Sequence, residues 1–182
     1  AIILGALMLA LGVFALSQMN RMDAASAEIR ENWLPSLATA EGISTTLGRI
    51  RALTLRSVLL TDESDRRNTI SVIDGLVQSI PGRFDAYSKL VSSTQEQELL
   101  DQLRKAYDQY IGLQQQVVTA SRNGRIDEAT RLANGPLTGY ADGMAKALNN
   151  ISQFNNDGAR DSTNASQAAF IASERMVVIT LV

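Results

Sequence analysis

Apolar residues fill both ends of the chain, whereas its middle mixes apolar and polar positions. Residues 1–16 (AIILGALMLALGVFAL) and residues 176–182 (MVVITLV) contain no charged residue. The first run is slightly shorter than the roughly 20 residues that span a bilayer, and no Met or basic flank marks it as an intact signal peptide. We therefore expect a segment of a longer protein, in which residues 1–16 end one transmembrane helix and residues 176–182 begin another. The alternative is a soluble chain with two buried terminal helices.

Residues 17–175 are polar enough to form one domain outside the membrane, and caps and breakers divide them into four helical segments. The first segment runs from about residue 17 to 61 and the second from about 64 to 92. The third begins at Ser93, which has the capping-box spacing to Glu96. It ends near residue 122, before the Asn-Gly pair at 123–124. The fourth begins near Ile126 and runs into the C-terminal apolar stretch.

Short connections make neighbouring helices antiparallel. The pattern thus predicts an all-α, up-down-up-down four-helix bundle with two long and two shorter helices, which we expect to be dimeric. Proline removes a backbone donor and clashes with the preceding turn, so three prolines should bend the helices. Pro35 should kink the first helix or mark its start, with Asn32 as a candidate cap. Pro81 with Gly82 should interrupt the second segment, and Pro136 should begin a restarted helix in the fourth.

The stretch GRIRALTLR at 48–56 carries three arginines on a mostly apolar helix. At about 100° per residue, one stripe of this helix is apolar and predicts its core face. The stripe consists of Ile43, Leu47, Ile50, Thr54 and Val58. Arg49 and Arg56 lie about 20° apart on another face, which Thr45 shares, and Arg51 lies at the edge of the core stripe.

The face that carries Arg49 and Arg56 can meet either water or a second copy of the protein. Leu53 and Leu60 are predicted on the same face, and apolar residues between arginines suggest a partly buried, self-complementary contact. Arginines near a two-fold axis repel one another unless an anion lies between them, and their planar forks bind carboxylates. The alternative is a solvated face with ion pairs to nearby acidic residues, namely Glu41 and Asp62.

The residues level with Arg49 can be found by counting 12 residues from the distal end of each segment. The count reaches Leu76, Ile111 and Thr138, each to within about a turn, close to the YDQY and GPLTGY stretches. A helix starting at Pro136 would point free backbone N–H groups outward, which favours an anion. Tyr107 and Arg104 can instead serve packing. The predicted ligand-binding residues are Thr45, Arg49, Arg56, Arg104, Tyr107, Leu137, Thr138 and Tyr140.

Composition narrows the possible chemistry. The chain has no Cys and no His, which excludes disulfides, zinc ligation through these residues, and Ser–His or Cys–His nucleophilic catalysis. Its net charge of −2 gives no sign of nucleic-acid binding. No nucleophile–base pair or metal-ligand pattern stands out, so we expect a protein that is not an enzyme and needs neither a metal nor another cofactor.

Over almost its whole length the sequence resembles the periplasmic ligand-binding region of methyl-accepting chemotaxis proteins, the four-helix-bundle type related to the aspartate and serine receptors. NWLPS at 32–36 is similar to a recurring element of that family. GRIRALTLRSVLLTD at 48–62 resembles the stretch of the aspartate receptor whose arginines, from both subunits, hold the ligand's carboxylates. Arg49 matches the first of those arginines, and Arg56 matches a later one only approximately. Thr138 in GPLTGY matches a threonine that holds the ligand together with neighbouring backbone groups.

This resemblance implies the sensor domain of an inner-membrane chemoreceptor, with the domain in the periplasm. It also implies a homodimer that binds its ligand near the dimer interface and signals by a small shift of the last helix. No contacts for an α-amino group can be placed, so we expect a non-amino organic acid, either a dicarboxylate such as malate or an aromatic acid such as benzoate or protocatechuate. A histidine-kinase sensor domain and a helical partner-binding module are the alternatives.

Overall fold

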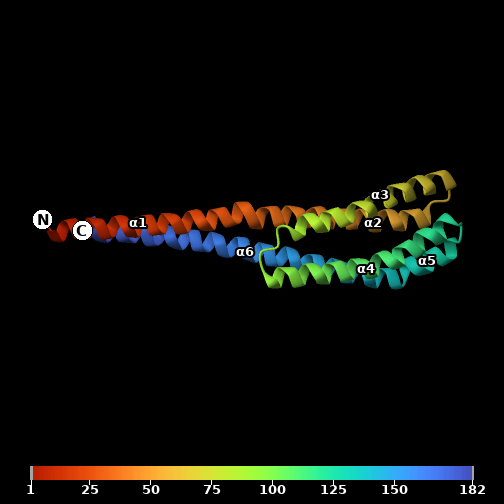
Figure 1. Cartoon of the computed structure of the whole chain (residues 1–182). Coiled ribbons are helices and arrows are strands. Elements are labelled where there is room, and N and C mark those ends of the chain that lie inside the picture. The colour runs from red at the N-terminus through yellow and green to blue at the C-terminus, as the bar shows by residue number, and fades with distance from the viewer. Residues whose placement is uncertain (1, 182) are drawn as a thin grey trace. The chain divides into compact units, whose positions relative to one another are not determined.

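The structure is a computed structural model that describes residues 2–181, apart from the side chains of residues 2–4, 6–7 and 179–181. Its elements are α1 (Ile2–Glu28), the π-helix η1 (Ile29–Trp33), α2 (Leu34–Leu59), α3 (Glu63–Ser88), α4 (Thr94–Arg122), α5 (Ile126–Asn134) and α6 (Pro136–Leu181). No strand occurs between residues 2 and 181, so the predicted all-α class is confirmed (Figure 1). The contacts divide these helices into two units, described in turn below. One spans residues 36–154, and the other combines the chain up to Pro35 with the part from Asn155 onward.

The unit of residues 36–154 is a helical bundle built from α2, α3, α4, α5 and the first part of α6 (Figure 1). Every residue of the predicted core stripe on α2 is buried, from Ile43, which is 1% exposed, to Val58, at 6%. The other helices contribute further fully buried side chains. Among the largest of these are Ile73 and Ile80 of α3, Leu100 and Leu103 of α4, and Ile151 of α6. The periodicity of apolar residues therefore correctly predicted which face of α2 packs inward.

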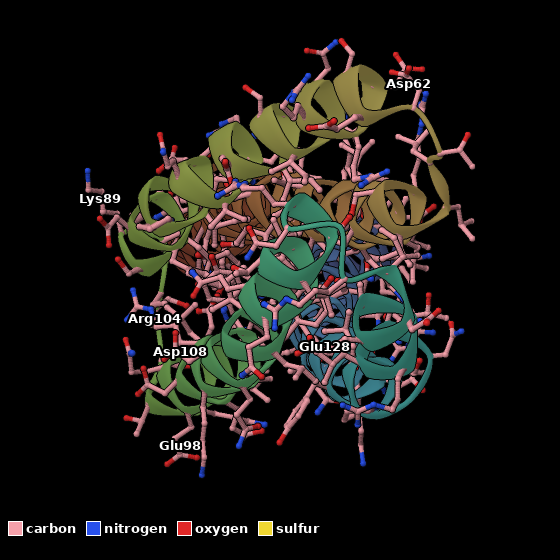
Figure 2. The ribbon with its side chains drawn as sticks, turned by 90° about the vertical axis from the view of Figure 1, so that its right-hand side faces the viewer. Asp62, Lys89, Glu98, Arg104, Asp108 and Glu128 are labelled. Carbon is pink, nitrogen blue, oxygen red and sulfur yellow. The ribbon has the colours of Figure 1, made fainter. Side chains whose placement is uncertain are left out.

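Side-chain caps set the starts of α3 and α4. Asp62 accepts a hydrogen bond from the backbone N–H of Asp65 at 2.8 Å and thereby starts α3, whose other end lies beside Lys89 (Figure 2). Ser93 caps α4 by accepting from the N–H of Glu96 at 3.1 Å, as predicted. The Glu96 carboxylate does not return to Ser93, as a complete capping box requires, but accepts from the N–H of Ser92 at 2.9 Å. At the other end of α4, Gly124 takes a φ of 73°, which suits glycine.

Of two predictions about helix breaks in this unit, one is wrong and one is confirmed. Pro81 with Gly82 does not interrupt the second segment, because α3 continues through both residues. Buried Ile80 and Phe84 hold this stretch against the core on either side, and Pro81 itself is exposed. Tertiary packing therefore outweighs the local cost of proline. The fourth segment is interrupted where predicted, because α5 ends at Asn134 and α6 begins at Pro136.

The other unit pairs α1 with the second part of α6, which run antiparallel beside each other (Figure 1). Pro35 neither starts the helix nor leaves Asn32 as a cap, because helical structure continues through both residues. The chain forms a π-helical turn instead, in which the N–H of Leu34 bonds to the carbonyl of Ile29. Pro35 cannot donate to the carbonyl four residues earlier, and a widened turn just before it accommodates the missing bond.

Trp33 anchors this pair of helices. Its ring is 8% exposed and packs against Gly158 of α6. The indole Nε1–H donates to the Ser162 hydroxyl at 3.0 Å, and Ser162 donates to the Glu28 carboxylate at 2.9 Å. A chain of hydrogen bonds therefore joins the end of α1, the π-helix and α6.

The apolar ends of the chain belong to this unit. Among residues 2–181, no helix is both long and apolar enough to cross a membrane by itself. The division into residues 1–16, 17–175 and 176–182 stays a prediction.

Candidate functional site

The arginine face of α2 is exposed. Arg49, Arg56 and Thr45 all lie on the open side of the helix. Neither Arg49 nor Arg56 forms an ion pair with any residue that the structure describes. Glu41, the acidic neighbour that a solvated ion-paired face would use, accepts instead from the Thr45 hydroxyl at 3.3 Å. Two guanidinium groups on this face therefore keep their hydrogen-bond donors available.

The apolar residues of that face differ from the predicted ones. Leu53 is partly buried against the core and Leu60 is half-buried, so neither is an open neighbour of the arginines. Leu55 and Leu59 are exposed instead, at 36% and 80%. Leu53 packs against the core, so the exposed apolar residues lie on the other side of the two arginines.

Arg104 and Tyr107 belong to a different contact, between α3 and α4. The Arg104 guanidinium lies 6.0 Å from the centre of the Phe84 ring and 4.0 Å from Asp85 of α3. Tyr107 is buried and meets the same ring edge-on at 5.4 Å between centroids. Burial raises the pKa of Tyr107, and the nearby charge of Asp108 adds to this. Arg104 lies along the outer side of α4 with Asp108 (Figure 2). These contacts support packing for both residues, the alternative noted from the sequence.

The start of α6 carries the remaining three predicted residues. Leu137 is 2% exposed, whereas Tyr140 is 41% exposed. The backbone N–H of Thr138 bonds to the carbonyl of Gly135 at 3.3 Å, and its hydroxyl donates to Ala133 at 3.3 Å. Both donors of Thr138 therefore serve the turn between α5 and α6. The outward free N–H group that the sequence suggested for Thr138 is absent in this conformation.

A groove between α2 and α6 shows which residues are level with one another. It has a volume of ≈ 140 Å³, and its walls come from Leu47, Gly48 and Arg51 on α2 and Ala141, Met144 and Ala145 on α6. The part of α6 level with Arg49 therefore lies about one turn after Thr138. This agrees with the count along the fourth segment, which gave Thr138 to within about a turn.

Arg51 links the two walls of this groove. Its guanidinium lies 3.7 Å from the carboxylate of Asp142, and the two side chains are 41% and 68% exposed. Ser44 and Asn149 add polar groups to the lining, whereas Met144 and Leu148 are apolar. An exposed ion pair of this kind contributes only about 0–1 kcal/mol, so another carboxylate can displace Asp142 at small cost.

The sequence placed Arg51 at the edge of the core stripe but did not include it in the site. None of the eight predicted residues lines the α2–α6 groove. The eight fall instead into three local groups, on α2, at the α3–α4 contact and at the start of α6. The signal that could have found Arg51 is its angular position between core and solvent, where a long cationic side chain reaches a neighbouring helix.

Behind Arg51 the bundle core holds a polar layer. The Gln114 amide donates to the Thr54 hydroxyl at 2.9 Å, and Thr54 donates to the carbonyl of Ile50 at 2.8 Å. Tyr110 is fully buried, and its hydroxyl makes no hydrogen bond with a described residue. Thr54 is a polar neighbour of that hydroxyl, but it already accepts from Gln114 and donates to Ile50. Burial raises the pKa of Tyr110 to about 12, against the opposing effects of the Arg51 charge and the Thr54 hydroxyl.

This shift predicts how alkaline pH affects stability. The pKa of Tyr110 is higher in the folded than in the unfolded protein, where it is about 10, so its contribution is complete below about pH 10 and is lost as pH rises toward 12. The loss should reach about 2–3 kcal/mol. The Tyr110→Phe protein should not show this loss of stability, because phenylalanine has no ionisable hydroxyl. Denaturant unfolding of both proteins across this range measures the difference, and parallel pH profiles would contradict the prediction.

Comparison with known proteins places these features in context. The family described as "Four helix bundle sensory module for signal transduction" matches residues 1–170. The Bacillus subtilis (strain 168) protein YvaQ, which is named as a sensory transducer protein, is 20% identical over 162 residues. The aligned part covers 89% of this chain but only 28% of YvaQ. The chain is thus similar to a small part of a longer protein.

Proposed function

Because the chain belongs to the family of four-helix bundle sensory modules for signal transduction, we propose that it is the ligand-binding module of a bacterial transmembrane chemoreceptor. In this proposal the module lies in the periplasm and the receptor is held in the inner membrane by the helices that flank the module. The ligand is a small organic acid, either a dicarboxylate or an aromatic carboxylate. The module acts without catalysis and without a cofactor.

The observation that carries the ligand class is the ion pair between Arg51 and Asp142 at the α2–α6 groove. A ligand carboxylate would replace Asp142 on the guanidinium, which binds carboxylates at two points. The apolar wall at Met144 and Leu148 would accept the ligand's carbon atoms. Arg49, with its unpaired guanidinium on the adjacent open face, would attract anions to this side of the bundle.

Exchange of the ion-pair partner also provides a signal. In the unliganded module the ion pair between Arg51 and Asp142 connects α2 to α6. A bound acid would replace Asp142 on Arg51 and so remove this connection. Since α6 continues beyond the bundle, release of Asp142 would allow a small shift of α6 along α2. A ligand shifts such an equilibrium only by its difference in affinity for the two states, and exchange of a partner on α6 supplies such a difference.

A second copy of the chain is the proposed partner for the open face of α2. Exposed Leu55 and Leu59 alternate there with Arg49 and Arg56, a mixture of apolar and arginine side chains common in protein interfaces. A two-fold dimer would bring the arginines of both copies together. Anionic ligand between them would then reduce their repulsion.

The test is calorimetric titration of the whole 182-residue chain with organic acids that raise its melting temperature. Arg51→Ala should weaken binding about 10- to 100-fold, because a charge-assisted contact contributes about 1.5–3 kcal/mol. Asp142→Asn should strengthen binding up to about 5-fold, because it removes the competing carboxylate. Arg67→Ala is the matched control, since Arg67 pairs with Glu63 on α3 away from the groove.

Comparing Arg51→Ala with Arg49→Ala distinguishes this site from its alternatives. Unchanged affinity in Arg51→Ala, together with loss in Arg49→Ala, would move the acid to the open face of α2. Failure of every dicarboxylate and aromatic acid to raise the melting temperature would favour a module read by a protein partner. A histidine-kinase sensor remains the second candidate for the whole receptor, because the same module serves signal transduction in either setting.

A further inference from the structure

A second groove lies between α3 and α4, and it shares no lining residue with the α2–α6 groove. It has a volume of ≈ 430 Å³, and its lining includes Asp74, Val77 and Gln78 of α3 and Val118, Thr119 and Arg122 of α4. We propose that this groove binds a small zwitterion, a molecule with an ammonium group and a carboxylate a few atoms apart. Arg122 would hold the carboxylate, and Asp74 would hold the ammonium group.

An ion pair connects the two walls of the α3–α4 groove. The Arg122 guanidinium lies 2.9 Å from the Asp74 carboxylate, and both side chains are 51% exposed. Each of the two residues lines the groove from its own helix. An exposed ion pair contributes little to stability, so it opens at small cost. Each side chain can therefore exchange its present partner for a ligand group of the same charge.

A comparison with Arg104 shows why this ion pair can exchange its partners. Arg104 also reaches from α4 to α3, where it lies 4.0 Å from Asp85, but its guanidinium lies 6.0 Å from the centre of the Phe84 ring as well. Arg104 is therefore held by a packing contact, and it does not line the groove. Arg122 pairs with no described residue other than Asp74.

The charges of the groove favour a ligand that carries both signs. Among the described lining residues, Asp74 and Arg122 are the charged ones. A simple carboxylate would displace Asp74 from the guanidinium but would leave two like charges side by side, which repel. A simple ammonium ion would leave Arg122 without a partner. A zwitterion pairs with both side chains at once, and the guanidinium can bind its carboxylate at two points.

The rest of the lining suits a short carbon chain between the two charges. Val118 is 5% exposed and Val77 is partly buried against the core, and both line the groove. Methylene groups placed on these valines would leave water without losing hydrogen bonds. The Gln78 carboxamide and the Thr119 hydroxyl can donate to a carboxylate oxygen that Arg122 leaves free.

The experiment titrates the whole chain with β-alanine and, as its two matched halves, with propionate and ethylamine. NMR methyl signals of Val77 and Val118 report on this groove, and the methyl signal of Met144 reports on the α2–α6 groove. We expect a Kd of about 1–10 mM for β-alanine. Each half should bind at least about 5-fold more weakly at the valines, because one exposed charge contact is lost.

Variants of the ion pair test the two assigned roles. Asp74→Asn and Arg122→Gln should each raise the Kd of β-alanine about 5-fold, and both proteins should fold because the two side chains are exposed. Arg125→Ala is the matched control. Arg125 is similarly exposed, at 52%, but it pairs with Glu128 on α5 and does not line the groove.

Three results would overturn the proposal. They are the absence of a saturable β-alanine shift at the two valines, equal affinity for β-alanine and either half, and an unchanged Kd in Asp74→Asn. A shift confined to Met144 would place β-alanine in the α2–α6 groove and would also count against this site. Because Arg51→Ala leaves the α3–α4 groove intact, loss of the organic-acid site would not alter the shifts at Val77 and Val118.

Discussion

Gly158→Ala should destabilise the α1–α6 pair by about 2–4 kcal/mol. A Cβ atom at this position would lie within 2.7 Å of three atoms of the Trp33 ring, closer than real Cβ contacts allow. The indole would have to move, which costs packing and its 3.0 Å hydrogen bond to Ser162. For a chain of this length the melting temperature should fall by roughly 5–15 °C.

Trp33 provides a direct readout of this change, because it is the single tryptophan of the chain. Its emission should shift to longer wavelength in Gly158→Ala as the ring becomes exposed. Gly143→Ala is the matched control on the same helix, since a Cβ there meets nothing within 4 Å. That variant should be neutral or slightly stabilising, because alanine favours helix. Identical melting and emission in wild type and Gly158→Ala would show that the ring does not depend on the glycine.

A double variant separates steric conflict from general damage to α6. Trp33→Leu removes most of the ring, so the added methyl group at residue 158 would find space. Gly158→Ala should then cost less in the Trp33→Leu background than in wild type, which is the coupling expected of residues in contact. Circular dichroism follows the unfolding of all four proteins. Equal costs in both backgrounds would show that the destabilisation does not come from contact with the Trp33 ring.

Glu96→Ala should lower the free energy of unfolding by about 3 kcal/mol. The carboxylate is fully buried in the first turn of α4. It accepts hydrogen bonds from the Tyr87 hydroxyl at 2.9 Å, from the Ser92 N–H at 2.9 Å and from the Ser92 hydroxyl at 3.2 Å. Alanine removes all three, and a hydrogen bond to a charged group contributes a net of about 1.5–3 kcal/mol. Removing the buried charge itself returns part of this sum, because its burial is costly.

Denaturant unfolding measures this effect, and Glu98→Ala is the control, because Glu98 lies exposed on the same helix. The control should stay within about 0.5 kcal/mol of wild type. A double-mutant cycle that combines Tyr87→Phe with Glu96→Ala should measure the part of this energy that comes from the Tyr87–Glu96 hydrogen bond. If both glutamate variants unfold alike, the turn does not depend on the buried carboxylate.

The helices themselves follow from local patterns in the sequence. The stripe from Ile43 to Val58 predicted the buried face of α2, and the cap at Ser93 and the Asn-Gly pair at 123–124 predicted the ends of α4. These signals lie within a few residues of the feature they specify, so they need no knowledge of the fold. Pro136 likewise predicted the start of α6.

Pro81 shows where a local signal was insufficient. Pro81 has a breaker's chemistry, but Ile80 and Phe84 beside it are held in the core, and their burial outweighs the lost hydrogen bond.

The sequence by itself determined the all-α class, the inward face of α2, most helix ends and the sensory family, because all of these depend on periodicity, caps and motifs within short stretches. Only the tertiary structure decided that Arg51 meets Asp142, that Gln114 donates to Thr54, and that Trp33 packs on Gly158. Each of these contacts joins residues far apart in the chain. They depend on the register between packed helices, which ridge-and-groove fit sets and which no short stretch of sequence encodes.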